Sequence, residues 1–206
     1  MDAEQDRRIL LGARAPSGED NERDLGVARE VDSRNVVDEF KGLPVEEIRR
    51  ELATRRRPFA TLILNIDYDL NIATIVRSHN AFCGQEIFYL GRRKFNRRGC
   101  VGTYHYENIT YFEDLERALA EIPTDYTWIG IDNRPGAVPM VDFEWPEKPL
   151  IIFGHEKDGL DFLPQLPYHC SQVLKIPQIG STRSLNVGVA AGITMYDLST
   201  KKGWLK

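Results

Sequence analysis

Short apolar runs alternate with segments of helical periodicity along most of this sequence. The apolar runs are five to eight residues long and continuous, a pattern typical of strands that are buried on both faces of a sheet. They predict strands over 59–66, 86–90, 127–131, 149–154 and 172–177. The segments between and after them predict helices over 71–82, 112–122 and about 184–200. Strands that alternate with helices predict an α/β fold with a mainly parallel sheet and helices on both faces.

The N-terminal part of the sequence differs in composition from the rest. Residues 1–34 contain nine acidic and six basic side chains and no aromatic one, so we expect a disordered charged tail. Residues 35–58 are predicted to form a helical extension, because Pro44 stands near a helix start and acidic residues follow it in the first turn. Residues 59–206 then form one domain of ordinary size.

Composition argues against several classes of protein. No apolar run approaches the roughly 18 residues of a membrane span, and no apolar signal segment is present, so we expect a cytoplasmic protein without a membrane partner. The three cysteines lie far apart and form no CxxC pair, which argues against a disulfide framework and a structural metal site. The formal charge of −4 restricts any polyanion site to a local patch.

Two loops that leave predicted strands contain residues suited to chemistry, at the sheet edge where α/β proteins bind ligands. In the first loop, Asn71 stands at a helix start and Arg77 follows about one and a half turns later. In the second, Gly154 comes directly after an apolar strand and Glu156 follows it. The structural alternative for the first loop is a capped helix with a solvated arginine. The structural alternative for the second loop is a plain glycine-rich turn.

A third loop leads from the last strand into the C-terminal helix. Gly180 turns the chain, Ser184 is well placed to cap the helix, and Asn186 can cap or line its start. The helix that follows carries no charge from 187 to 196. Because such a helix needs burial on nearly all sides, we expect it to pack deep in its own domain or against a partner subunit.

Taken together and in this order, the three loops resemble the motifs of the SpoU/TrmH family of RNA ribose methyltransferases, within the SPOUT superfamily. The matching stretches are NIATIVR (71–77), FGHEKDGL (153–160), and Ile176-Pro177 with Gly180 and SLNVGVA (184–190). The resemblance covers roughly residues 60–201. It implies a C-terminal deep trefoil knot, S-adenosylmethionine as cofactor, and a homodimer.

The resemblance also implies roles for particular residues. The cofactor-lining positions are Phe153, Gly154, Ile176, Gly180 and Leu185. The active-site positions are Asn71, Arg77, Glu156, Ser184 and Asn186. Two residues depart from the family pattern, since Ala73 and Lys157 stand where the family has glycine. Neither change removes a reactive group, and Lys157 rules out a turn that strictly needs a positive φ at that position.

The implied reaction transfers a methyl group to a ribose 2′-hydroxyl of RNA. The family assigns proton acceptance to the counterpart of Arg77. With a reference pKa of about 12.5–13.8, deprotonating an arginine at pH 7 costs roughly 7–9 kcal/mol. An arginine that holds the target phosphate and orients the hydroxyl costs less, with the proton lost late or to water.

The segment RRKFNRR (92–98) is the predicted RNA-binding patch. It holds five basic residues in seven and an interleaved Phe95, which suit backbone contact and base stacking. The basic residues are Arg92, Arg93, Lys94, Arg97 and Arg98. Residues 55–57, all arginine, add a second cluster. A solvated loop is the alternative.

Other functions stay open at this point. The runner-up is a knotted RNA-binding protein that no longer transfers methyl groups. A nucleotide-binding doubly wound domain and an ordinary Rossmann-type methyltransferase are both disfavoured, because no glycine-rich loop follows the first strand. The sequence leaves transfer RNA and ribosomal RNA equally open as substrates.

Overall fold

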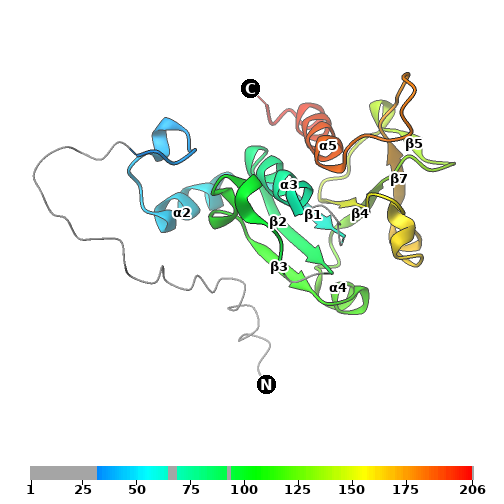
Figure 1. The fold of residues 1–206 in the computed structure, drawn as a ribbon, viewed down its shortest axis with the longest axis horizontal. Helices are drawn as coiled ribbons and strands as arrows, with labels where there is room; N and C mark the ends of the chain where they lie inside the picture. The colour runs from blue at the N-terminus through cyan, green and yellow to red at the C-terminus, as the bar shows by residue number, and fades with distance from the viewer. Residues whose placement is uncertain (1–31, 65–68, 92–93, 206) are drawn as a thin grey trace, which may run out of the picture.

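A seven-stranded sheet forms the centre of the computed structural model, which describes residues 32–64, 69–91 and 94–205 (Figure 1). The strands are β1 (Arg57–Ile63), β2 (Gly84–Leu90), β3 (Ile109–Phe112), β4 (Thr127–Ile131), β5 (Val138–Pro139), β6 (Pro149–Phe153) and β7 (Gln172–Lys175). Their order is β3-β2-β1-β6-β4-β7-β5, and every pair of neighbours is parallel. The predicted α/β fold with a parallel sheet is confirmed.

The five predicted strands are all present, and the sheet contains two more that were not predicted. β4 has the predicted bounds, and the ends of the others differ by up to three residues. β3 and β5 escaped prediction because they are four and two residues long and lie at the two edges of the sheet. In addition, Phe112, the last residue of β3, fell in the segment predicted as a helix over 112–122, whereas the helix observed there begins at Leu115.

Helices cover both faces of the sheet, as predicted. α3 (Asp69–Ala81) and α5 (Val187–Lys201) cover one face and α4 (Leu115–Glu121) covers the other, whereas α2 (Val45–Arg55) belongs to the N-terminal extension. Alternate residues of β1 point to opposite faces: Phe59 and Ile63 pack with α3 and α5, whereas Leu62 packs with α4. Figure 1 shows α3 and α5 on one side of the sheet and α4 on the other.

Short 3₁₀ helices connect several of these elements. They are η1 (Asp38–Phe40), η2 (Arg97–Cys100), η3 (Thr103–His105), η4 (Met140–Asp142), η5 (Leu160–Phe162) and η6 (Leu166–His169). Leu160 and Leu166 fill the apolar layer on the α4 side, where α4 alone would leave the sheet uncovered. Within the described ranges, no helix combines the length and apolar character that a membrane span requires.

The small residues of α5 let it lie close against α3. A Cβ atom added to Gly188 would lie 2.9 Å from Cγ2 of Thr74, and one added to Gly192 would lie 3.7 Å from Oγ of Ser78. Ala191 and Met195 of α5 are buried in the core on this face of the sheet. Close packing against α3 therefore explains why one side of α5 carries no charge. Burial within its own domain does not explain the other sides of the helix.

The N-terminal extension packs against residues 105–108, which lead from η3 to β3. Ile48 of α2 forms a small apolar cluster with Phe40 and Tyr106. Just after α2, the Arg56 side chain is only 4% exposed and pairs with the buried Glu107 at 2.5 Å. The prediction that Arg56 contributes to an exposed basic cluster is therefore wrong. Residues 1–31 of the predicted tail lie outside the described residues.

Candidate active site

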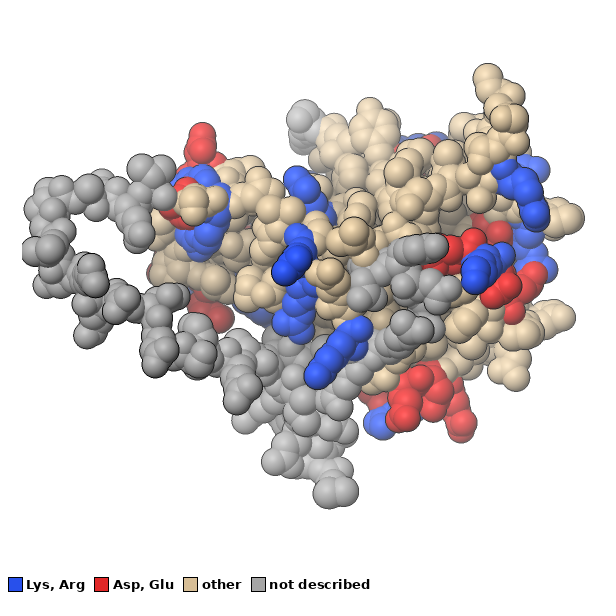
Figure 2. Space-filling model, viewed as in Figure 1, with Lys and Arg blue, Asp and Glu red and all other residues tan. Residues whose placement is uncertain are grey.

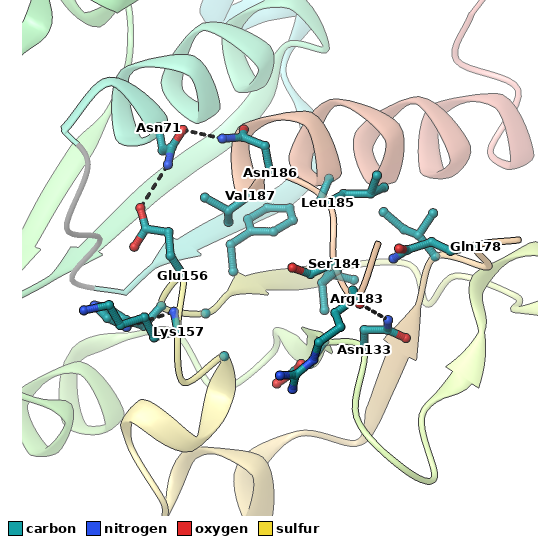
Figure 3. A pocket seen from close by; sticks show the side chains of 18 residues that line it. Asn71, Asn133, Glu156, Lys157, Gln178, Arg183, Ser184, Leu185, Asn186 and Val187 are labelled. Atoms are coloured by element: carbon teal, nitrogen blue, oxygen red, sulfur yellow. Dashed lines mark hydrogen bonds between the residues drawn. The ribbon is translucent and has the colours of Figure 1, made fainter. Parts of the chain in front are cut away.

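The three loops singled out by their sequence meet at one cavity. Its volume is about 680 Å³, and it lies at the carboxyl ends of the strands (Figure 3). Asn71 contributes from α3, the loop after β6 contributes residues 153–157 and 159, and the segment between β7 and α5 contributes most of the opposite wall. The sheet order explains this meeting, because the strand order reverses between β1 and β6, where α/β folds form such crevices.

A chain of hydrogen bonds joins the three loops inside the cavity. Nδ2 of Asn71 donates to Oε1 of Glu156 at 2.9 Å, and Nδ2 of Asn186 donates to Oδ1 of Asn71, also at 2.9 Å. Figure 3 shows both bonds at the upper left of the cavity. Both ends of the Asn71 amide are thus engaged, which fixes its orientation.

Asn186 rather than Ser184 caps the C-terminal helix. Its Oδ1 accepts hydrogen bonds from the backbone N–H groups of Gly188 and Val189, and α5 begins at Val187. Of the two predicted cap candidates, Asn186 is therefore confirmed and Ser184 is not, and the helix starts three residues later than the predicted 184. Ser184 instead lines the cavity.

Most of the predicted site residues come together, and two do not. Eight line the cavity: Asn71, Phe153, Gly154, Glu156, Ile176, Ser184, Leu185 and Asn186. Gly180 is exposed and does not line it. Arg77 lies on α3 with an exposed side chain, also outside the cavity lining.

The two departures from the family pattern are accommodated locally. Ala73 is buried against Gly99 of η2, where a Cβ atom added to Gly99 would lie 2.8 Å from that of Ala73. Among the described residues only Cys83 and Val101 combine a side chain with positive φ, so Lys157 has an ordinary backbone, as expected. The positive φ of this turn falls at Gly159, at +56°.

Gly154 is required by the fold of its own turn. A Cβ atom added there would lie 2.3 Å from the carbonyl carbon of Gly159. The turn closes through paired backbone hydrogen bonds between His155 and Gly159, at 3.0 and 2.9 Å. The glycine therefore lets residues 155–159 fold back over the end of β6 and present their main chain to the cavity.

The predicted RNA-binding patch is only partly described. Arg92 and Arg93 lie outside the described residues, whereas Lys94, Arg97 and Arg98 are exposed. Figure 2 shows basic side chains over the middle of the face in view.

Phe95, which the sequence analysis offered for base stacking, is half-buried. Its ring lies 5.7 Å from that of Tyr89. Part of the Phe95 ring is therefore used by the core.

The sequence analysis missed several residues that line the cavity. Asp132 and Asn133 follow β4, and Gln178 and Arg183 lie between β7 and α5. The signal for the first pair was available, because polar residues that directly follow a predicted parallel strand lie at the ligand-binding edge. No group of three His, Cys, Asp or Glu side chains in 32–64, 69–91 and 94–205 could hold a metal ion.

Curated relatives of this chain are methyltransferases by name. An uncharacterized tRNA/rRNA methyltransferase of Synechocystis sp. is 28% identical over 154 residues, which cover 71% of this chain and 39% of the relative. The 23S rRNA (guanosine-2'-O-)-methyltransferase RlmB of Xylella fastidiosa is 33% identical over 85 residues, which cover 41% of this chain and 33% of RlmB. This chain thus spans less than half the length of either relative.

Solved structures share the fold. The TrmH/SpoU tRNA modifying enzyme of A. aeolicus aligns with a TM-score of 0.68 at 20% identity, covering 78% of this chain and 83% of that one. The SpoU methyltransferase AviRb of Streptomyces viridochromogenes, crystallised with its cofactor AdoMet, aligns with a TM-score of 0.64 at 21% identity, covering 71% and 59%. The model of the SpoU rRNA Methylase family matches residues 58–196, which include all three loops of the cavity. This chain therefore belongs to the SpoU rRNA Methylase family.

Proposed function

We propose that this protein transfers a methyl group from S-adenosylmethionine to a ribose 2′-hydroxyl of tRNA or rRNA. The observation that carries the proposal is the meeting of the three motif loops at one cavity in a chain of an RNA methyltransferase family. The 2′-hydroxyl as acceptor is supported by the RlmB relatives, which are named as guanosine-2'-O methyltransferases. An RNA substrate is also the reason to expect the protein in the cytoplasm.

The residues of the cavity fit S-adenosylmethionine. Small-molecule sites typically have volumes of about 300–1,000 Å³, and this cavity has that size. Its lining combines an apolar part, which suits the adenine and ribose carbons, with a larger number of polar and charged side chains. Its apolar residues are Ile131, Phe153, Ile176, Leu185, Val187 and Ala190. Its charged residues are Asp132, Glu156, Lys157 and Arg183, two of each sign, which suit the zwitterionic end of the cofactor. We assign Gly154, Ile176 and Leu185 to the cofactor.

The residues of this chain act mainly by positioning. When bound, S-adenosylmethionine supplies a methyl group on a sulfonium, which is already a good leaving group. Glu156 and Ser184 place acceptor oxygens in the cavity, where they can orient the ribose hydroxyl, and the hydrogen bond from Asn71 holds Glu156 in place. Holding two reactants in line is worth up to about 7–11 kcal/mol of the barrier. The proton leaves late, to water.

Arg77 is assigned to the RNA rather than to proton transfer. Its exposed position on α3 allows the guanidinium to grip a phosphate with two parallel hydrogen bonds. Because Arg77 does not line the cavity of its own chain, the RNA must extend from the cavity over α3. We assign the basic residues of 92–98 to the same RNA surface.

A homodimer and a C-terminal knot complete the proposal. One face of α5 carries Val189, Ile193 and Tyr196, which are 52%, 37% and 58% exposed. These residues are spaced four and three apart, so they form one apolar stripe on the helix. A second copy of the chain that packs on this stripe would give the uncharged helix the burial that its own domain leaves incomplete. The knot is proposed from family membership.

Cofactor binding and transfer together test the function. Isothermal titration with S-adenosylmethionine should give a heat of binding, and RNA incubated with protein and cofactor should gain 2′-O-methyl nucleosides detectable by mass spectrometry. The alternative of a knotted RNA-binding protein without transferase activity requires RNA binding with no heat from the cofactor. Comparing RNA from cells with and without the protein would then identify the nucleotide.

A further inference from the structure

The loop after β4 contacts both loops that wall the cavity. β4 lies between β6 and β7 in the sheet, so its carboxyl end emerges between the loops that follow those two strands. Asp132 and Asn133 are the first two residues after β4, and both line the cavity. Neither belongs to the three motif loops.

Asp132 supports the turn after β6. Its Oδ2 accepts a hydrogen bond from the backbone N–H of Leu160 at 2.9 Å, and a Cβ atom added to Gly159 would lie 2.4 Å from the same oxygen. The backbone N–H of Asp132 donates to the carbonyl of Leu174 in β7 at 2.9 Å. The side chain therefore ties the 155–159 turn to a residue that is itself anchored in the sheet.

Asn133 supports the opposite wall. Its Nδ2 donates to the backbone carbonyl of Arg183 at 2.7 Å, a bond that Figure 3 shows at the base of the cavity. Arg183 directly precedes Ser184 and lies three residues before Asn186, the cap of α5. Residues 178–186 otherwise lack regular structure, so this bond restrains a segment with few local constraints.

We propose that Asp132 and Asn133 are positioning residues that set the spacing between the two walls of the cavity and thereby the affinity for S-adenosylmethionine. They act through the main chain of Leu160 and Arg183. The neighbouring Arg134 also reaches the loop after β6, through Asp161 at 2.9 Å, but that ion pair is exposed and contributes little. This inference rests on the proposed function for its ligand and on the two side-chain hydrogen bonds for its geometry.

The test compares two asparagines that make the same kind of bond. Asn133→Asp replaces the donor with a carboxylate that repels the Arg183 carbonyl. Asn108→Asp is the matched control, because Asn108 is also exposed and its Nδ2 donates to the carbonyl of Gln85 at 3.2 Å, at the other end of β2 and away from the cavity. Calorimetry gives the Kd for S-adenosylmethionine, and hydrogen exchange of the free protein gives the protection of residues 184–189.

Asn133→Asp should raise the Kd about tenfold, the loss expected for one net hydrogen bond, and should speed exchange over 184–189. Asn108→Asp should leave both quantities within about twofold of wild type. Asp132→Asn keeps an oxygen that can accept from Leu160 and should bind within about threefold of wild type, whereas Asp132→Ala should resemble Asn133→Asp.

Two results separate failure of this inference from failure of the function. If wild type and Asn133→Asp bind the cofactor equally and exchange equally, the positioning role is overturned while the function stands. If wild type gives no heat with S-adenosylmethionine, the proposed function fails and the affinity role falls with it. In that case hydrogen exchange alone tests whether Asn133 restrains the cavity wall at residues 184–189. An exchange rate in Asn133→Asp equal to that of wild type would overturn this restraining role as well.

Discussion

Nδ2 of Asn71 donates a hydrogen bond to Oε1 of Glu156 across 2.9 Å, although 85 residues separate them in the chain. The bond joins the start of α3 to the loop after β6, and Asn186 continues it to the cap of α5. The amide of Asn71 thus acts as the central link between three segments that local sequence places far apart. Breaking that link should affect chemistry more than folding.

Asn71→Asp should lower the rate of methyl transfer by about 10²-fold or more. The substitution places a carboxylate against Glu156 and removes the donor between them, so the two oxygens repel and Glu156 leaves its position. Single-turnover transfer at saturating cofactor measures the effect. The exposed Asn108→Asp variant serves as control, and equal rates in the two variants would contradict the role given to Asn71.

Arg77→Lys should reduce transfer by about ten- to a hundredfold while leaving cofactor affinity unchanged. Lysine keeps the charge but cannot grip a phosphate with two parallel hydrogen bonds. Arg77 is exposed and does not line the cavity, so calorimetry with the cofactor should not detect the change. Near-full activity of the lysine variant would show that charge alone suffices.

Ile193→Glu should convert a dimer into a monomer. A carboxylate in the middle of the exposed α5 stripe would have to be buried by the second copy, at a cost of several kcal/mol. Sedimentation velocity gives the mass. Val37→Glu is the matched control, since Val37 is an apolar residue that is 59% exposed and lies near η1. A monomeric wild type would refute the proposed dimer.

Replacing Lys94, Arg97 and Arg98 with glutamine should weaken RNA binding and its dependence on salt. For a single-stranded RNA, neutralising one side chain that binds a phosphate reduces the magnitude of the slope of log K against log salt by about 0.7. The triple variant should therefore reduce it by about 2. Fluorescence anisotropy at several salt concentrations measures the slope. Arg117→Gln on α4, where Arg117 pairs with Glu121, should leave it unchanged. An unchanged slope in the triple variant would remove the patch from the RNA surface.

The buried His79 should cause the free energy of unfolding to decrease as the pH falls. Burial lowers the pKa of His79 to about 3, while Oγ1 of Thr61 lies 2.9 Å from its Nδ1. Between the ordinary pKa of about 6.5 and the lowered one, the unfolded chain binds a proton that the folded protein does not. The free energy of unfolding therefore falls by up to about 1.4 kcal/mol per pH unit below pH 6.5.

Urea denaturation between pH 7 and pH 4 checks this dependence. In His79→Gln the proton-linked loss is absent, so the difference in unfolding free energy between wild type and variant should shrink as the pH falls. The exposed His169→Gln should keep the wild-type dependence. A difference between wild type and His79→Gln that does not vary with pH would contradict the prediction.

Local pattern was sufficient for most of the helices and strands and for the motif loops. A strand such as β4 could be bounded from its residues alone, because it is a short, continuous and mostly apolar run. The three loops could be expected at one edge, because parallel strands all end there. The edge strand β3 was not predicted, since it is only four residues long and its last residue, Phe112, was predicted to begin the helix that starts at Leu115.

What the sequence by itself determined is the parallel α/β scheme, the family motifs and the residue types of the cavity. Only the tertiary structure decided which neighbours those residues have. The structure has Asn186 rather than Ser184 as the cap, buries Arg56 against Glu107 and leaves Arg77 outside the cavity. It also places Gln178 and Arg183 in the cavity wall. The physical reason is that the lateral order of strands, which sets these contacts, depends on packing between distant segments and leaves no periodic trace in the chain.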